Sequence, residues 1–317
     1  MIELHEIEAA RARIADVAVR TPLVRLHAAG VPDGTEVYLK LEALQPIGSF
    51  KTRGATNAVR LAPVQARGRG LVTASAGNMA QGVAWAAREL GLSATIAVPE
   101  HAPQAKLSAI ERLGGRIVKL PYDDWWQTII TGSVDGVDGL FVHPVQDEGV
   151  MAGNGTIGLE ILDDLPDPDA VVIPYGGGGL TVGIASAIRA LKPDTKIYTA
   201  EPATGAALAA ALPAGEPIDV EYSASFVDGA GSRRVLDSMW PRVRELVDDA
   251  FAVPIAEAAA AVRVLATRAH VVAEGAGALA TAAALAGHAG AGKVVCIVSG
   301  GNINPAKLAE ILHGGDV

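Results

Sequence analysis

The alternation of short apolar runs with amphipathic stretches limits this chain to the α/β folds. Residues 71–74 are typical of a buried strand, and small apolar residues then recur at helical spacing over 80–87. Two further strands are predicted at 94–98 and 117–120, with a helix over 103–113 between them. Because parallel neighbours need a crossover connection, this order predicts a parallel sheet.

The same pattern returns in the second half of the chain. It predicts strands at 170–173, 196–200 and 294–298, and a helix over 180–191. We therefore expect an α/β fold with two open, twisted, mainly parallel sheets that carry helices on both faces, and a ligand cleft at their carboxyl edges. The segment 123–139 lacks clear periodicity, so we predict it to be the hinge or connection between two α/β units.

Composition excludes several classes of protein. The net charge of -9 argues against nucleic acid as a partner, because phosphate backbones need a basic surface. The one cysteine, Cys296, lies in an apolar run and is expected to be a small buried side chain. The charged start of the chain predicts no signal peptide, and charges interrupt every long apolar stretch. We expect no membrane partner and a cytoplasmic location.

Lys51 is the strongest candidate for a reactive group. It stands in Ser49-Phe50-Lys51-Thr52-Arg53-Gly54-Ala55, at the predicted first turn of a helix that Ser49 can cap. The helix dipole and burial both disfavour an ammonium there, so the pKa of Lys51 is expected to be low. A partly neutral lysine is a nucleophile suited to Schiff-base formation with a carbonyl.

Three loops follow predicted strands and are therefore expected at the carboxyl edges of the sheets. The first opens a helix, where backbone N–H groups suit a carboxylate. The second places four glycines before a helix, which lets the backbone approach a phosphate closely. In the third, a serine hydroxyl could bond an uncharged ring nitrogen. In chain order, these loops are Ser75-Ala76-Gly77-Asn78-Met79, Tyr175-Gly176-Gly177-Gly178-Gly179-Leu180 and Ser299-Gly300-Gly301-Asn302.

A dinucleotide-binding fold offers a rival interpretation of the second loop. Glu201 ends the next predicted strand at the distance where such folds place an acid. The glycine spacing fails, however, because Thr181 or Val182 stands where the last glycine is required. A nicotinamide-dependent oxidoreductase is therefore the more distant alternative.

Together, the lysine and the loops resemble the fold-type II pyridoxal-phosphate enzymes, with a tryptophan synthase beta-like fold. Within that class they resemble the serine/threonine dehydratase (ammonia-lyase) and serine racemase group. The resemblance covers nearly the whole chain, because the group's motifs occur in its order. Besides the lysine motif and the three loops, these motifs are Gly153-Asn154-Gly155-Thr156 and Glu274-Gly275-Ala276-Gly277.

The resemblance implies a role for each site residue. Lys51 would hold pyridoxal 5'-phosphate and act as the catalytic base, with Phe50 packed near the ring. Asn78 would bond the phenolic oxygen of the cofactor, and Glu274 would belong to the same cofactor site. Ser299 would meet the ring nitrogen. The segment Gly176-Gly177-Gly178-Gly179-Leu180 would bind the phosphate, and Ser75-Ala76-Gly77-Asn78-Met79 would bind the substrate carboxylate.

The implied activity is β-elimination of a β-hydroxy L-amino acid, such as threonine or serine, to a 2-keto acid and ammonia. Three departures from the group's pattern bear on it. Ala76 stands where racemases of the group have a second serine, and alanine cannot transfer a proton. Met79 replaces the usual histidine, so the resemblance leaves the side-chain specificity open. Ala207 stands where a second acid would accompany Glu201 in a cation site, so we predict no metal.

Other interpretations stay open beside the elimination. With the same cofactor, the chain could be an amino-acid racemase or a β-replacement enzyme, and a non-catalytic binding protein could keep the fold. The adjacent Trp125 and Trp126 could pack between units or form the wall of a substrate pocket.

The resemblance also predicts how the chain is organised. It implies a homodimer whose large cofactor-binding domain comprises 1–69 and 147–317. The small, mobile substrate-binding domain would comprise 70–146. Because the chain ends soon after the Ser299 loop, we expect no regulatory domain and no feedback inhibition by an end-product amino acid.

Overall fold

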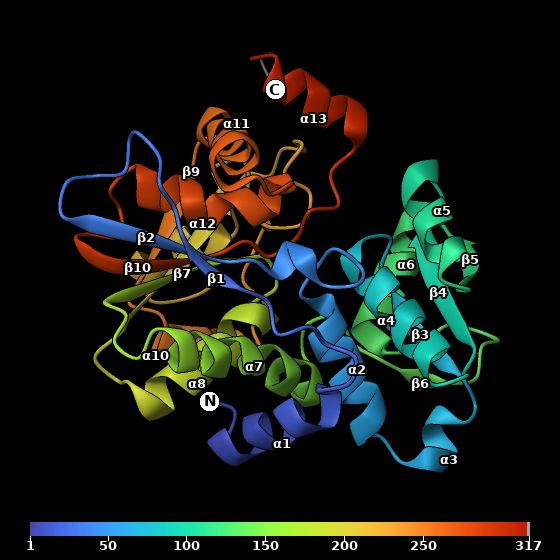
Figure 1. Ribbon diagram of the computed structural model, residues 1–317. Helices are drawn as coiled ribbons and strands as arrows, with labels where there is room; N and C mark the ends of the chain where they lie inside the picture. Colours follow the sequence, from blue (N-terminus) through green and yellow to red (C-terminus); the bar gives the residue numbers. More distant parts are fainter. Residues whose placement is uncertain (316–317) are drawn as a thin grey trace.

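The computed structural model describes residues 1–315 and contains two separate sheets (Figure 1). The larger has six strands, which are all parallel to their neighbours except that β1 runs antiparallel to β2. In spatial order these are β1 (Leu23–Arg25), β2 (Thr35–Lys40), β10 (Gly292–Ile297), β7 (Ala170–Pro174), β8 (Lys196–Pro202) and β9 (Asp249–Val253).

The smaller sheet has four strands, all parallel to their neighbours. In spatial order these are β5 (Arg116–Leu120), β4 (Ala94–Pro99), β3 (Leu71–Ala74) and β6 (Leu140–Phe141). The predicted α/β class with two mainly parallel sheets is therefore confirmed.

Helices cover both faces of the six-stranded sheet, and the two hydrophobic cores lie between these helices and the strands (Figure 1). One face carries α1 (Leu4–Ile14), α7 (Glu148–Asp164), α8 (Gly179–Leu191) and α10 (Trp240–Leu246). The other carries α11 (Ile255–Val264) with its π-helical extension η2 (Leu265–Ala269), α12 (Gly275–Leu285) and α13 (Pro305–Leu312). The short α9 (Ala207–Ala214) follows β8.

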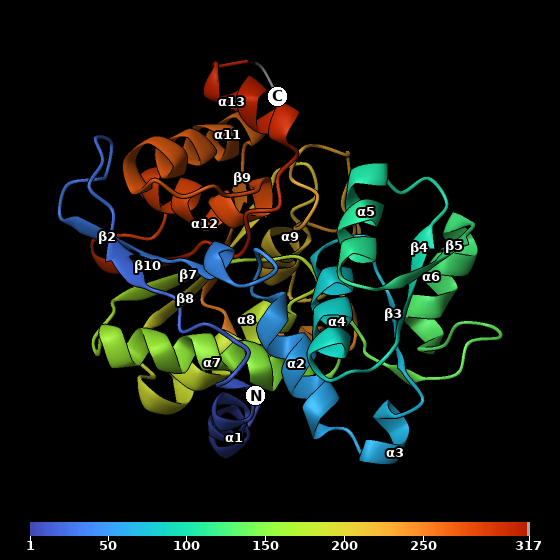
Figure 2. The same ribbon diagram turned by 45° about the vertical axis from the view of Figure 1, so that its right-hand side comes forward.

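The four-stranded sheet has its own helices and its own two cores. Helices α4 (Asn78–Glu89) and α5 (Gln104–Arg112) pack on one face, and α6 (Tyr122–Thr131) packs on the other. Helix α2 (Lys51–Leu61) lies between α4 and α7 and so connects the two halves of the molecule, and α3 (Val64–Arg67) follows it (Figure 2).

The predicted hinge or connection between units at 123–139 is wrong. Residues 123–131 belong to helix α6, which packs on the four-stranded sheet, and strand β6 of the same sheet follows at Leu140. Asp123 and Asp124 occupy the first turn, where acidic side chains favour helix formation. Trp125 and Ile129, one turn apart, pack on the sheet, while Ile130 is 63% exposed. Because apolar residues also occur on the solvent face, the sequence shows no clean helical stripe.

Close packing through glycine holds α2 and α8 against α7. A Cβ at Gly153 of α7 would lie 2.6 Å from the carbonyl oxygen of Arg53 in α2. A Cβ at Gly183 of α8 would lie 2.3 Å from the carbonyl oxygen of Met151 in α7. This explains the Gly153-Asn154-Gly155-Thr156 motif, because larger side chains would separate the helices.

Four strands of the two sheets were not predicted from the sequence. These are β1, β2, β6 and β9, whereas every predicted strand is present to within a few residues. Cys296 is fully buried, as expected. None of the helices over residues 1–315 has the length and apolar character needed to cross a bilayer.

Candidate active site

One cavity of about 380 Å³ brings together every residue that the sequence singled out for the site. It receives loops from both sheets, at the ends of β3, β7 and β10 and at the start of α2. The predicted residues that line it are Phe50, Lys51, Ser75, Ala76, Gly77, Asn78, Met79, Gly176, Gly177, Gly178, Gly179, Leu180, Glu274 and Ser299.

Lys51 is the first residue of α2, as the sequence indicated. Its Nζ donates to the carbonyl oxygen of Pro144 at 3.1 Å and lies 5.0 Å from the centre of the Phe50 ring. Burial lowers the pKa of Lys51 to about 8, because the ammonium loses its hydration. A useful fraction of neutral amine is therefore present near neutral pH.

The start of α2 differs from the sequence prediction in one detail. Phe50, rather than Ser49, occupies the N-cap position, and the Ser49 hydroxyl is 3.4 Å from the backbone nitrogen of Lys51. Backbone contacts hold this turn instead. The backbone N–H of Phe50 donates to the Ser299 carbonyl at 3.1 Å, and the backbone N–H of Gly301 donates to the Gly48 carbonyl at 2.9 Å. These bonds fix the lysine turn against the serine loop.

Asn78 and Glu274 are hydrogen-bonded to each other in the lining of the cavity. Asn78 Nδ2 donates to Glu274 Oε1 at 2.7 Å, and Asn78 Oδ1 accepts from Asn302 Nδ2 at 2.7 Å. Burial raises the pKa of Glu274 to about 7. A Cβ at Gly300 would lie 2.4 Å from Glu274 Oε1, so a side chain there would displace this carboxyl group.

The glycine loop leads directly into α8, which begins at Gly179. Gly178 has φ +93°, a left-handed conformation that favours glycine. A Cβ at Gly177 would lie 2.4 Å from Val145 Cγ2. The first N–H groups of α8 have no carbonyl of their own helix to bond, so this end of the cavity can bind an anion.

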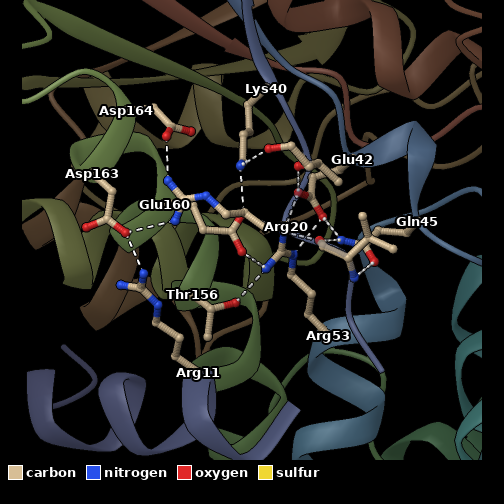
Figure 3. Close-up of polar contacts among 12 residues, drawn as sticks. Arg11, Arg20, Lys40, Glu42, Gln45, Arg53, Thr156, Glu160, Asp163 and Asp164 are labelled. Carbon is tan, nitrogen blue, oxygen red and sulfur yellow. Dashed lines mark hydrogen bonds and ion pairs between the residues drawn. The ribbon is translucent and has the colours of Figure 1, made fainter. Parts of the chain in front are cut away.

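A buried ion network anchors the helix that carries Lys51 (Figure 3). Arg53 is 1% exposed and lies between two carboxylates. It donates to both oxygens of Glu42 at 2.8 Å, and to the two oxygens of Glu160 at 2.7 and 2.8 Å. Lys40 completes the cluster, with Nζ 2.6 Å from Glu160 Oε2. The four charges cancel, and they connect α2 to β2, α7 and the short helix η1 (Glu42–Leu44).

Glu201 lies outside the cavity lining and has a structural role. It is fully buried, and its carboxyl oxygens accept from the backbone N–H groups of Leu208 and Ala209 at 3.1 and 2.8 Å. Burial raises its pKa to about 7. Over residues 1–315, no group of three or more His, Cys, Asp or Glu side chains could hold a metal ion.

The lining also contains residues that were not predicted as part of the site. Among them are Pro144, which accepts from Lys51, Val145, which contacts the glycine loop, and the ion pair formed by Lys106 and Asp228. The pair joins residues 122 positions apart, so no local signal could have revealed it.

The two adjacent tryptophans have different surroundings. Trp125 lines the cavity, whereas Trp126 is 42% exposed. The position of Trp125 agrees with the hypothesis of a pocket wall, and that of Trp126 does not.

Comparisons with known proteins agree with this geometry. Residues 14–300 match the family described as "Pyridoxal-phosphate dependent enzyme". The L-threonine ammonia-lyase of Thermotoga maritima is 40% identical over 323 residues, which cover 99% of this chain and 79% of that protein. The structure of threonine deaminase isoform 2 from Solanum lycopersicum has a TM-score of 0.86 and 32% identity, covering 98% of this chain and 86% of that one. Maize serine racemase has a TM-score of 0.87 and 31% identity, covering 98% and 97%.

The chain belongs to the family of pyridoxal-phosphate-dependent enzymes, and its cofactor is pyridoxal phosphate. The residues of the cavity fit this group. Lys51 supplies an amine of lowered pKa, and the glycine loop lines the cavity at the start of α8, where free backbone N–H groups suit a phosphate. Ser299 lines the cavity, where a hydroxyl suits a ring nitrogen that carries no proton.

Proposed function

We propose that this enzyme is an ammonia-lyase that removes the β-hydroxyl and the amino group of an L-amino acid such as threonine or serine. The products are a 2-keto acid and ammonia. The observation that carries the proposal is the convergence of Lys51, the glycine loop and Ser299 on one cavity in a member of this family. The names of the relatives, an L-threonine ammonia-lyase and a threonine deaminase, support it.

Each end of the cavity would hold a different part of the reactants. The N–H groups of Gly176–Gly179 and Leu180 would bind the cofactor phosphate, and Phe50 would lie against its ring. Asn78 would donate to the phenolic oxygen, with Glu274 positioning the Asn78 amide. The Ser75–Met79 loop would bind the substrate carboxylate. When bound, the cofactor supplies an electron sink for the charge that develops at Cα.

Lys51 would move the proton on which the reaction depends. Once the substrate amine has replaced it, the neutral Nζ takes the proton from Cα, a contribution of about 10²–10⁴-fold for general-base catalysis. The lowered pKa favours this step, because the amine must be unprotonated to accept. As the Cα–H electron pair forms the new double bond, the β-hydroxyl would leave as water with the proton held by Lys51. The enamine would then be released, and its hydrolysis by water gives the 2-keto acid and ammonia.

The experiment is a visible spectrum of the purified protein followed by addition of L-threonine, L-serine and L-threo-phenylserine in turn. We expect a band that borohydride removes, and keto acid from at least one substrate. Lys51→Ala should lose both. Keto-acid formation by Lys51→Ala without an added amine would contradict the proposal.

Racemisation is the second candidate, because a solved serine racemase shares the fold. Ala76 lines the cavity and offers no proton donor, which favours elimination. Chiral analysis of serine recovered after partial turnover separates the two. We expect the remaining serine to stay in the L form.

The domain division follows the two sheets. All strands of the four-stranded sheet fall within 70–146, and those of the six-stranded sheet fall within 1–69 and 147–317, which supports a mobile unit over 70–146. Hydrogen exchange should show protection gained over 70–146 when substrate is added. A homodimer in the cytoplasm completes the proposal, tested by sedimentation and by cell fractionation.

A further inference from the structure

The charged side chains of the cavity include one cation and one anion with no part in the proposed chemistry. The lining contains four ionisable side chains, namely Lys51, Lys106, Asp228 and Glu274. Lys51 would attach to the cofactor, and Glu274 bonds Asn78. Lys106 and Asp228 instead bond each other, with Lys106 Nζ 2.5 Å from Asp228 Oδ2.

The pair joins the two halves of the molecule at the edge of the cavity. Lys106 lies on α5, beside the four-stranded sheet, and Asp228 lies in the chain between α9 and α10, on the side of the six-stranded sheet. Their side chains are 34% and 57% exposed, so the pair is at the solvent side of the cavity. Both charges act on Glu274, because Asp228 raises its pKa and Lys106 lowers it. Because both residues line the cavity, the pair is close enough to affect a bound substrate.

The rest of the lining indicates which part of the substrate meets this pair. In the proposed function, the glycine loop would face the phosphate, Lys51 would face the reacting carbon, and the Ser75–Met79 loop would face the carboxylate. Among the remaining lining residues, Pro99, Trp125 and Lys106 belong to the unit of the four-stranded sheet that also supplies the Ser75–Met79 loop. The substrate side chain would therefore lie against Pro99, Trp125 and the Lys106–Asp228 pair. Trp125 presents only its apolar ring there, because its Nε1 donates to the carbonyl oxygen of Ala97 at 3.2 Å.

We infer that the Lys106–Asp228 pair is a specificity element that admits uncharged β-hydroxy amino acids and excludes those with an anionic side chain. This inference rests on the proposed function. An anionic side chain would find Lys106 already neutralised and would face the like charge of Asp228. A hydroxyl, methyl or phenyl group carries no charge and meets no such repulsion.

Two amino acids test this directly. L-threo-3-hydroxyaspartate carries a carboxylate where L-threonine carries a methyl group, and is otherwise alike. We expect wild-type holoenzyme to prefer threonine in kcat/KM. Asp228→Asn removes a negative charge and frees Lys106, so the ratio of kcat/KM for hydroxyaspartate over threonine should rise by about tenfold or more. Lys106→Met leaves Asp228 unpaired, so the same ratio should fall.

The two variants should change the kcat/KM ratio in opposite directions, which distinguishes a specificity element from a merely structural contact. If the contact were merely structural, each variant would change kcat/KM for both substrates by the same factor. This result would overturn the inference. Asp167→Asn is the matched control, because Asp167 forms an exposed ion pair with Lys192 outside the cavity lining. Its ratio should equal that of the wild type. A wild-type enzyme that uses hydroxyaspartate as well as threonine would also overturn the inference.

A binding measurement separates this inference from the proposed function. Amino acids that bind the holoenzyme change the visible absorbance of its cofactor, whether or not elimination follows. Compared with the wild type, Asp228→Asn should bind L-aspartate more tightly relative to L-serine. Lys106→Met should bind L-aspartate less tightly relative to L-serine. If no keto acid forms but this shift is present, elimination is wrong and the specificity element stands. If keto acid forms without the shift, the specificity element is wrong.

Discussion

Replacing Arg53 by methionine should destabilise the protein far more than an ordinary surface arginine would. Methionine matches the arginine stem, but it leaves the carboxylates of Glu42 and Glu160 without the guanidinium between them (Figure 3). Glu160 keeps Lys40 as a partner. Glu42 keeps the neutral donors of Thr21 and Gln45, although it is fully buried.

The magnitude follows from this asymmetry. Removing one partner of a buried ion pair costs about 3–5 kcal/mol, because a charge remains buried without compensation. Arg11→Met is the matched control, since Arg11 and Asp163 form an ion pair with both side chains more than 40% exposed. Exposed pairs of this kind contribute about 0–1 kcal/mol. The two substitutions change the same residue type, so their difference isolates burial.

The assay is urea unfolding at pH 7, followed by circular dichroism, with the pH then lowered to 5. Burial alone would raise the pKa of Glu42, and Arg53 holds it below its ordinary value. Without Arg53, Glu42 can protonate as the pH falls. The loss in free energy of unfolding caused by Arg53→Met should therefore be smaller at pH 5 than at pH 7. Glu42→Gln combined with Arg53→Met should recover part of the stability for the same reason. If Arg53→Met lowers the free energy of unfolding by no more than Arg11→Met does, the reasoning is refuted.

Three further predictions concern the site and its surroundings. Attachment of pyridoxal phosphate to the apoenzyme should accelerate with pH and level off above about 8, because burial lowers the pKa of Lys51 to about 8; a stopped-flow rate that still rises at pH 10 would contradict this. Burial raises the pKa of Glu201 to about 7 from 4.5, so the folded state binds a proton that the unfolded state has released, and stability should fall as the pH rises from 4.5 to 7. Glu201→Gln should remove this part of the pH dependence in urea midpoints, and equal slopes in both proteins would show that Glu201 does not titrate in this range. Gly177→Ala should raise the Kd of pyridoxal phosphate by about tenfold or more, because its Cβ would lie 2.4 Å from Val145 Cγ2 and displace that residue or the loop; adding Val145→Ala should restore part of the affinity in equilibrium dialysis, and no restoration would exclude this contact as the cause.

The features that depend on local pattern could be predicted from the residues alone. Alternating strand and helix periods predicted two parallel sheets, because parallel strands need crossover helices. The loops that carry Asn78, Gly177 and Ser299 were placed at carboxyl edges for the same reason, and the structure brings them into one cavity with Lys51. The lysine turn and the glycine loop are short, so their backbone demands are visible in the residues themselves.

Features that depend on distant partners became visible only in the folded chain. Residues 122–131 form a helix because Trp125 and Ile129 find a sheet to pack on, and it is this packing that turns Trp125 into the cavity while Trp126 stays exposed. Arg53 is buried among carboxylates from Glu42 and Glu160, the latter 107 positions away. Lys106 meets Asp228 only because two separate sheets face each other. A charged residue looks the same in the sequence whether it is hydrated or paired, and its partner is fixed by the fold.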